Sequence, residues 1–144
     1  MTATDPADEV RATLTDFDRR FAAGDADALA ELFAEDADLL LLHRDPIEGR
    51  DAIQAYWRRF FAEYDPGAWA TDLRILDVHG DRAYAMAVYS ETLVHRGGDP
   101  SRIVHGRLVF FLRRDPDDRW RVAMIMNSHV RPVEVVPTNR VTGA

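Results

Sequence analysis

The stretch that decides the fold runs from residue 101 to residue 129 and has the sequence SRIVHGRLVFFLRRDPDDRWRVAMIMNSH. Two runs rich in β-branched, aromatic and other apolar residues, 101–113 and 119–129, flank the turn-forming segment Asp115-Pro116-Asp117-Asp118. Successive strands that are joined by a short polar turn pair as an antiparallel hairpin. The sequence therefore predicts two long neighbouring strands in the last third of the chain.

Two further strands are predicted before this hairpin, over residues 69–78 and 82–95. The turn His79-Gly80-Asp81 separates them, and residues 96–100, with two glycines and a proline, lead into the next strand. Most of these strands are longer than the usual length of about five or six residues. Because long antiparallel strands twist and curl, we expect a strongly curved sheet.

A helical pattern opens the chain. Asp5 and Pro6 are residue types that favour a helix start, and Gly24 is typical of a helix end. Between these positions, apolar residues recur at spacings of four, three and four, which places them on one helix face. The members of this stripe are Val10, Leu14, Phe17 and Phe21.

The segment between the first helix and the long strands is predicted to form a short helix, a strand and a third helix. Asp25 suits the start of the short helix. Residues 38–43 form a strand whose four successive leucines favour burial on both faces. The third helix follows Gly49 and stops at Asp65-Pro66-Gly67. Its inner face carries Ile53, Trp57, Phe60, Phe61 and Tyr64.

Helices first and strands later predict an α+β domain, with helices packed on one face of the sheet. We expect three N-terminal helices on the concave face of a curved, mostly antiparallel sheet. This arrangement is a cone-shaped α+β barrel with an apolar pocket at its mouth. The domain spans residues 5–131, and residues 132–144 form an extended or disordered tail.

The composition narrows the chemistry of the chain. Its 144 residues include no cysteine and no lysine, which excludes disulfides, thiolate nucleophiles and a lysine Schiff base. The net charge of −7, without a basic stripe, argues against nucleic-acid binding. No apolar run reaches the roughly 20 residues that cross a bilayer, and residues 1–6 lack the features of a secretory signal. We expect a cytoplasmic protein with neither a membrane nor a nucleic-acid partner.

No metal site and no cofactor are expected. The histidines are not spaced two or four residues apart, as they are in common metal-binding motifs, and there is no cysteine to replace them. The sequence also lacks a glycine-rich phosphate loop and a Gly-x-Ser-x-Gly turn, which are typical of nucleotide sites and serine hydrolases.

Three segments resemble the nuclear transport factor 2-like superfamily, in the order in which that superfamily has them. Residues 21–37, FAAGDADALAELFAEDA, resemble its opening signature, and Gly49 to Trp57 resemble its third helix. The run Gly106 to Phe110 and the run Trp120 to Val122 resemble its closing hairpin. The ending Met126-Asn127-Ser128 is most similar to small SnoaL-like members from enediyne and polyketide gene clusters. The likeness covers residues 8 to 131.

This resemblance leaves two kinds of function open. It implies either a cofactor-free cyclase or isomerase that acts on a hydrophobic polyketide-like substrate, or a non-catalytic ligand-binding or dimerisation module. Ketosteroid isomerase belongs to the superfamily, but its tyrosine and aspartate fall on Phe17 and Leu41 of this chain. Neither side chain can exchange a proton, so the machinery of that enzyme is absent at these positions.

The resemblance also implies a homodimer, because superfamily members commonly pair. The strand 101–113 has apolar residues on both faces, Leu108 and Phe110 on one and Val109 and Phe111 on the other. Helices can cover only one face of the sheet, so we expect the other to meet a second copy of the chain.

The catalytic candidates are His43, His105 and Arg107. His43 has the same strand parity as Leu41 and should face the pocket if Leu41 does, although a histidine at the pocket rim is the plainer alternative. His105 and Arg107 share one strand face. If that face is concave, His105 is a base and Arg107 stabilises an oxyanion; if it is convex, both lie in solvent or an interface.

Aromatic and methionine side chains are the candidates for a pocket lining, although such residues equally build a core. Asn127 is a candidate donor to a ligand carbonyl, although an edge-strand amide that bonds to backbone is the plainer alternative. Asp38 and Glu91 are the carboxylates nearest the predicted pocket strands, and either is a base if it is buried. The expected lining comprises Phe17, Leu41, Trp57, Phe61, Trp69, Met86, Met124, Met126 and Asn127.

Overall fold

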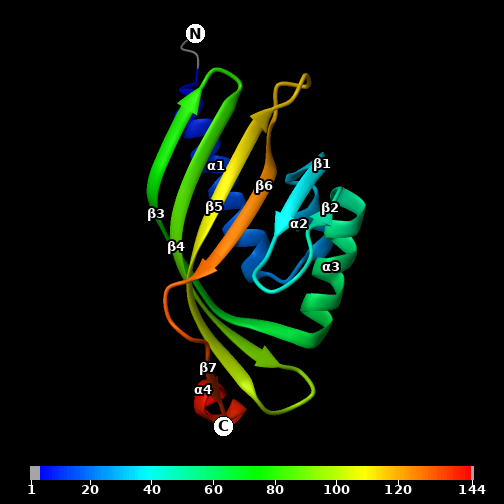
Figure 1. Cartoon of the computed structure of the whole chain (residues 1–144), viewed down its shortest axis with the longest axis vertical. Coiled ribbons are helices and arrows are strands. Elements are labelled where there is room, and N and C mark those ends of the chain that lie inside the picture. The colour runs from blue at the N-terminus through cyan, green and yellow to red at the C-terminus, as the bar shows by residue number, and fades with distance from the viewer. Residues whose placement is uncertain (1–3, 144) are drawn as a thin grey trace.

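The computed structural model describes residues 4–143, in which helices cover one side of a curved sheet (Figure 1). The expectation of no secretory signal rests partly on residues 1–3, which lie outside this range. The elements are α1 (Pro6–Ala22), α2 (Ala26–Ala30), β1 (Phe33–Leu40), β2 (Ile47–Glu48), α3 (Arg50–Glu63), β3 (Tyr64–His79), β4 (Arg82–His95), β5 (Ser101–Arg114), β6 (Trp120–His129), β7 (Glu134–Val136) and α4 (Thr138–Thr142).

The sheet has the strand order β2-β1-β6-β5-β4-β3, and β7 pairs with the beginning of β5. Strand β1 runs parallel to β6, whereas the other pairings are antiparallel. Figure 1 shows α1 crossing behind β3 to β6, with α3 beside β1 and β2. The predicted fold class, α+β with N-terminal helices on the concave face of a curved and mostly antiparallel sheet, is confirmed.

Helix α1 forms as its sequence predicts. The side chain of Asp5 accepts a hydrogen bond from the backbone nitrogen of Ala7 at 3.0 Å, so the helix start is capped. The apolar stripe is buried against the sheet, and the ring of Phe17 lies 5.3 Å from that of Phe110 on β5 in an edge-to-face contact. This packing fixes α1 across the concave face.

Successive side chains of β5 point alternately to the concave and to the convex side of the sheet. Val104, Gly106 and Leu108 point to the concave side and are buried. His105 and Arg107 point to the opposite, convex side, and Arg107 is exposed. The hypothesis that these two residues share the concave face is therefore wrong, because the register of β5 turns its even-numbered positions inward.

Two strand boundaries differ from those expected, and one short strand was not predicted. The first strand covers Phe33–Leu40 rather than 38–43, because the buried Phe33 already pairs with Val122 of β6 and the chain turns after Leu40. The short strand β2 had no sequence signal. Strand β3 begins at Tyr64 and continues through Pro66, which an edge strand tolerates because its free side needs no backbone N–H.

The tail is ordered in the structure. Residues 134–136 extend along β5 as β7, and the short helix α4 follows. Val136 is 2% exposed and covers the buried Ser101, whose Oγ lies 2.8 Å from Oγ1 of Thr138. Within residues 132–143 the segment is thus extended in part: β7 pairs with the start of β5, and α4 lies against β4. Residue 144 of the predicted tail lies outside the described residues.

Candidate active site

A cavity of about 400 Å³ opens between the inner face of the sheet, α1, α3 and the loop after β1. Most of its wall is apolar or aromatic. The lining residues are Phe17, Phe21, Leu39, Leu41, Leu42, His43, Arg44, Tyr56, Trp57, Phe60, Trp69, Tyr89, Glu91, Leu93, Arg102, Val104, Leu108, Ile125, Asn127, His129 and Val133. A cavity of this size and character suits a small hydrophobic molecule.

Six residues expected at the pocket lie in its wall: Phe17, Leu41, His43, Trp57, Trp69 and Asn127. Phe61 is buried behind the wall, where its ring lies 5.3 Å from that of Phe21. Met86, Met124 and Met126 point to the convex face, together with His105 and Arg107. The prediction that these three methionines line the pocket is therefore wrong, because each lies at an outward-facing position of its strand.

Three aromatic rings lie in contact, at tilted angles, in the cavity wall. The ring of Phe21 lies 4.2 Å from that of Trp69, which in turn lies 5.3 Å from the ring of Tyr89. The indole nitrogen of Trp69 donates to Asp18 Oδ1 at 2.9 Å, which fixes the ring in the wall. These flat surfaces favour a flat or polycyclic ligand.

Gly106 lets Tyr89 lie close to the sheet. A Cβ atom at this position would stand 2.4 Å from the carbonyl oxygen of Ser128 and 2.6 Å from Cε1 of Tyr89. Both approaches are far below van der Waals contact, so any larger residue would move the ring. The glycine therefore leaves the space that the Tyr89 ring occupies.

Glu91 is the one acid among the described residues that line the cavity. It lies on β4, opposite Trp69 of β3 and Val104 of β5. The side chain as a whole keeps some exposure, but its Oε2 is enclosed and has no hydrogen-bond partner. Burial raises the pKa of this carboxyl from 4.5 to about 7. A carboxyl with such a pKa can accept or return a proton near neutral pH.

Three potential hydrogen-bond donors share the cavity with Glu91. Within residues 4–143, the indole nitrogen of Trp57 is the only other buried side-chain polar atom without a partner. Burial raises the pKa of Tyr89 to about 12, and the charge of Glu91 adds to that rise. Burial likewise raises the pKa of Tyr56; the nearby guanidinium of Arg44 opposes this rise, and the charge of Glu91 adds to it. Both phenols therefore keep their protons and can donate to a ligand oxygen.

Asn127 joins the wall to the loop after β1. Its Oδ1 accepts a hydrogen bond from the backbone nitrogen of Leu42 at 2.9 Å, and its Nδ2 donates to the hydroxyl of Tyr89 at 3.5 Å. The amide therefore orients the Tyr89 hydroxyl and holds the loop, rather than standing free for a ligand carbonyl.

Basic side chains gather at the mouth. His43 and Arg44 come from the loop after β1, Arg102 from the start of β5 and His129 from the end of β6. Burial lowers the pKa of His129, and the nearby His43 lowers it further. His43 itself is exposed, as the alternative of a rim histidine anticipated.

A family model for the SnoaL-like domain matches residues 14–123. The chain belongs to the SnoaL-like domain family. Solved structures share the fold of this chain. A ketosteroid isomerase-like protein from Erwinia carotovora atroseptica superposes with a TM-score of 0.82 at 16% identity, covering 90% of this chain and 100% of that one. No functionally curated protein matches the chain.

Two further structures show the same fold. A nuclear transport factor 2-like superfamily protein from Salmonella enterica serovar Typhimurium has a TM-score of 0.75 at 16% identity, covering 88% of this chain and 92% of that one. A nuclear transport factor 2-like protein with a cystatin-like fold from Novosphingobium aromaticivorans has a TM-score of 0.62 at 27% identity, covering 85% and 80%. The SnoaL-like chain thus has the nuclear transport factor 2-like fold.

The cavity of this SnoaL-like domain differs from the predicted site chiefly in which acidic residue it contains. Phe17 and Leu41 do line it, so the positions expected for the isomerase tyrosine and aspartate face the ligand space without acid or base groups. Glu91 and Asp38 were both candidate bases, and Asp38 is not in the cavity wall: it alternates with the buried Ala37 and Leu39. The strand register that selects Glu91 depends on long-range pairing and is not visible in local sequence.

Neither a metal-binding cluster nor a spanning helix is found within the described part of the chain. No group of three or more histidine, aspartate or glutamate side chains there can hold a metal ion. No helix between residues 4 and 143 has the length and apolar character that crossing a membrane requires.

Proposed function

We propose that this SnoaL-like protein is a cofactor-independent enzyme of the isomerase or cyclase type that moves a proton on a hydrophobic, polyketide-like carbonyl compound. The observation that carries the proposal is Glu91: a carboxyl oxygen without a partner, enclosed in an apolar cavity, whose pKa of about 7 suits proton transfer. His43 reaches only the mouth, so we assign the proton transfer to Glu91.

The chemistry begins when ionised Glu91 takes a proton from a carbon next to a substrate carbonyl. The electron pair of the broken C–H bond moves into the carbonyl, which becomes an enolate. The indole N–H of Trp57 and the hydroxyls of Tyr56 and Tyr89 are the donors available to stabilise its oxygen. These groups are held by the wall before the reaction begins, which is what such stabilisation requires.

Two reactions can follow from the enolate, and in each of them Glu91 gives the proton back to the product. In an isomerisation, Glu91 returns it to a second carbon of the conjugated system, and the double bond moves. In a cyclisation, the enolate carbon attacks another carbonyl carbon of the same molecule, a C–C bond forms, and the resulting alkoxide takes the proton from Glu91. Neither route consumes an oxidant or a second substrate. The size of the cavity and the aromatic rings in its wall favour a flat, partly unsaturated substrate.

The test uses exchange of a carbon-bound proton. The protein is incubated in deuterium oxide with 1-tetralone, a hydrophobic cyclic ketone, and loss of the α-proton signal is followed by NMR. The wild type should accelerate exchange, with a rate that rises through about pH 7 as Glu91 ionises. Glu91→Gln should lower the rate by about a hundredfold or more. Glu48→Gln, at an exposed position on β2, is the matched control.

Equal exchange rates in the wild type and Glu91→Gln would contradict the assignment of Glu91. Ligand binding without any acceleration of exchange would favour the non-catalytic binding module. The homodimer and the cytoplasmic location stay predictions from the sequence.

A further inference from the structure

Two arginines at the mouth of the cavity keep their charges free of acidic partners. Most arginines of this acidic chain pair with aspartate or glutamate, but no salt bridge within residues 4–143 involves Arg44 or Arg102. Both line the cavity mouth beside His43 and His129. The ligand space is therefore bordered by positive charge in a protein whose net charge is −7.

Aromatic rings support both guanidinium groups. Cζ of Arg44 lies 4.6 Å from the ring centroid of Tyr56, which itself lines the cavity. Cζ of Arg102 lies 6.0 Å from the ring centroid of Tyr64. A ring face orients a guanidinium but leaves its N–H groups free for an oxyanion. These contacts restrain the arginines near the mouth without neutralising them.

The backbone that carries the two arginines is also fixed. The loop before Arg44 is held by the hydrogen bond from Leu42 to Asn127, and His43 adopts a φ of 62°, a left-handed conformation that is uncommon for a residue other than glycine. Arg102 lies between Leu93 of β4 and Val135 of β7. The two positive charges are thus mounted on well-defined elements rather than on a free tail.

The positive mouth is separate from the buried acid. Burial raises the pKa of Glu91, and no salt bridge within residues 4–143 joins it to either arginine. Along the concave face, Glu91 is opposite Val104, whereas Arg102 is two residues nearer the start of β5. Glu91 and the two unpaired arginines therefore border the same cavity at different positions, Glu91 and Arg102 on neighbouring strands and Arg44 on the loop after β1.

We infer that the pocket takes amphipathic carboxylates: molecules with a flat apolar body that lies against the ring wall and a carboxylate held by Arg44 and Arg102. Guanidinium groups bind carboxylates through paired N–H···O bonds, and the surrounding apolar wall strengthens them. The inference rests on the proposed function, since it assigns the substrate class of the same cavity. In this binding mode the carboxylate points to the cavity mouth, and the reacting carbonyl lies near Glu91.

The experiment compares 2-naphthoate with its neutral analogue 2-naphthamide by titration calorimetry on the full chain. At about pH 6, below the pKa of about 7, Glu91 is mostly neutral and does not repel the anion. The carboxylate should bind about tenfold more tightly than the amide at low salt. Its advantage should shrink at about 0.5 M salt, because screening weakens charge pairs.

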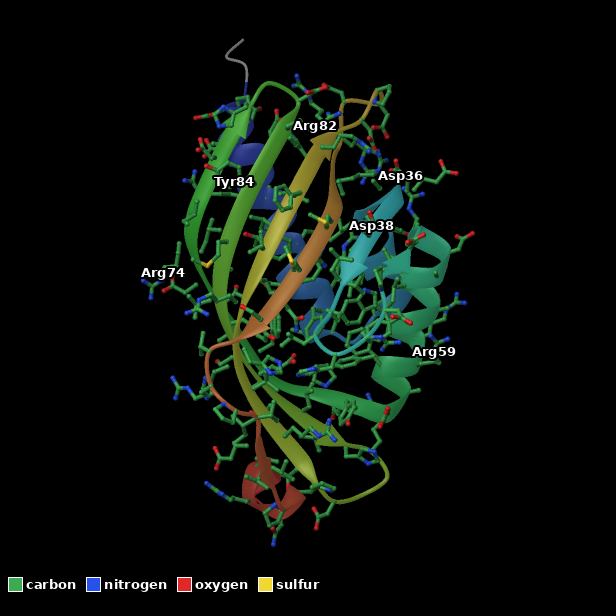
Figure 2. The ribbon with its side chains drawn as sticks, in the orientation of Figure 1. Asp36, Asp38, Arg59, Arg74, Arg82 and Tyr84 are labelled. Atoms are coloured by element: carbon green, nitrogen blue, oxygen red, sulfur yellow. The ribbon has the colours of Figure 1, made fainter. Side chains whose placement is uncertain are left out.

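Four single variants locate the anion site. Arg44→Gln and Arg102→Gln should each reduce naphthoate affinity severalfold and leave naphthamide affinity unchanged. Arg107→Gln is the matched control on the convex side of the same strand, and Arg59→Gln is the control on α3, where Arg59 lies on the side facing away from the sheet (Figure 2). All four arginines are exposed, so these changes should not unfold the protein.

The outcomes separate this inference from the proposed function. Equal affinities of the two probes, or equal losses in Arg107→Gln and Arg102→Gln, would overturn the carboxylate site while leaving Glu91 as a base for neutral ketones. Arginine-dependent naphthoate binding together with unchanged proton exchange in Glu91→Gln would support the inference and overturn the enzyme proposal. Failure of both probes to bind would overturn the inference.

Discussion

At the scale of single residues, the enclosed carboxyl of Glu91 suits the proposed proton transfer but lowers the stability of the fold when it is ionised. A carboxyl without a partner in an apolar cavity is held at a free-energy cost whenever it is ionised. A glutamine at the same site would avoid that cost and would fill nearly the same volume. We interpret the retained acid as the group around which the cavity works.

This conflict predicts how stability depends on pH. The folded state binds the Glu91 proton more tightly than the unfolded chain, because its pKa is raised from 4.5 to about 7. The free energy of unfolding therefore falls as pH rises between these values, and above pH 7 the cost reaches at most about 3 kcal/mol. Glu91→Gln should be more stable than the wild type at pH 8 and about equally stable at pH 4.5. Urea unfolding at both pH values measures the difference.

The control for this prediction is Glu48→Gln, whose exposed side chain should give the same stability difference at both pH values. If Glu91→Gln matched the wild type at pH 8, the carboxyl would be well solvated in the cavity. The argument for Glu91 as the base would then lose its support.

At the scale of elements, the sequence predicts the positions of the long strands well, but it predicts poorly which side chains of each strand point to the concave face. Strands β4, β5 and β6 were located within a residue or two, because long apolar runs between turn residues are a local signal. The local sequence does not show which face of the sheet carries His105 and Arg107, because both sides of β5 have apolar residues. Only the pairing of β5 with β4 and β6 turns Leu108 inward. The placement of Glu91 followed from that same pairing.

Strand β7 had no sequence signal for the same reason. Three residues show no periodicity, and their order comes from contact with β5. Val136 is 2% exposed there, whereas its neighbour Val135 is 60% exposed. The burial of one valine and the exposure of the next follow from strand alternation on an existing template.

This alternation predicts unequal effects of two identical truncations. Val136→Ala should lower the free energy of unfolding by about 1.5 kcal/mol, because it removes two buried methyl groups. Val135→Ala should change it by less than about 0.5 kcal/mol, because the side chain is solvated. Chemical denaturation of both variants measures this. Equal effects would mean that β7 does not pack on β5 in solution.

At the scale of the whole molecule, the convex face of the sheet carries an apolar band that no described helix covers. Ile75, Met86, Val109 and Met126 stand in one row across β3 to β6, each opposite the next. A second row contains Tyr84 and Phe111, and Figure 2 shows Tyr84 on the face of β4 turned away from α1. The band ends where Arg107 and Ser128 pair.

Such a band is unusual for a protein that stays monomeric. Ile75, Phe111 and Met126 are 45%, 40% and 41% exposed, and they lie on adjacent or nearby strands rather than scattered over the surface. Contiguous apolar surface of this kind usually marks an interface. A two-fold pairing of the same face on two copies would bury both bands at once, which is the commonest symmetry of soluble oligomers.

We therefore expect light scattering at micromolar concentration to give twice the monomer mass of 16.4 kDa. Phe111→Glu and Met126→Glu should each shift the protein toward the monomer, because a pairing through this band would bury the new charge without a partner. Val135→Glu places the same charge at an exposed apolar position on β7 and should leave the mass unchanged. A wild-type mass of 16.4 kDa would contradict the dimer. A dimer that persists in both sheet variants would place the interface elsewhere. Because the cavity opens on the concave side, ligand binding should survive the loss of this pairing.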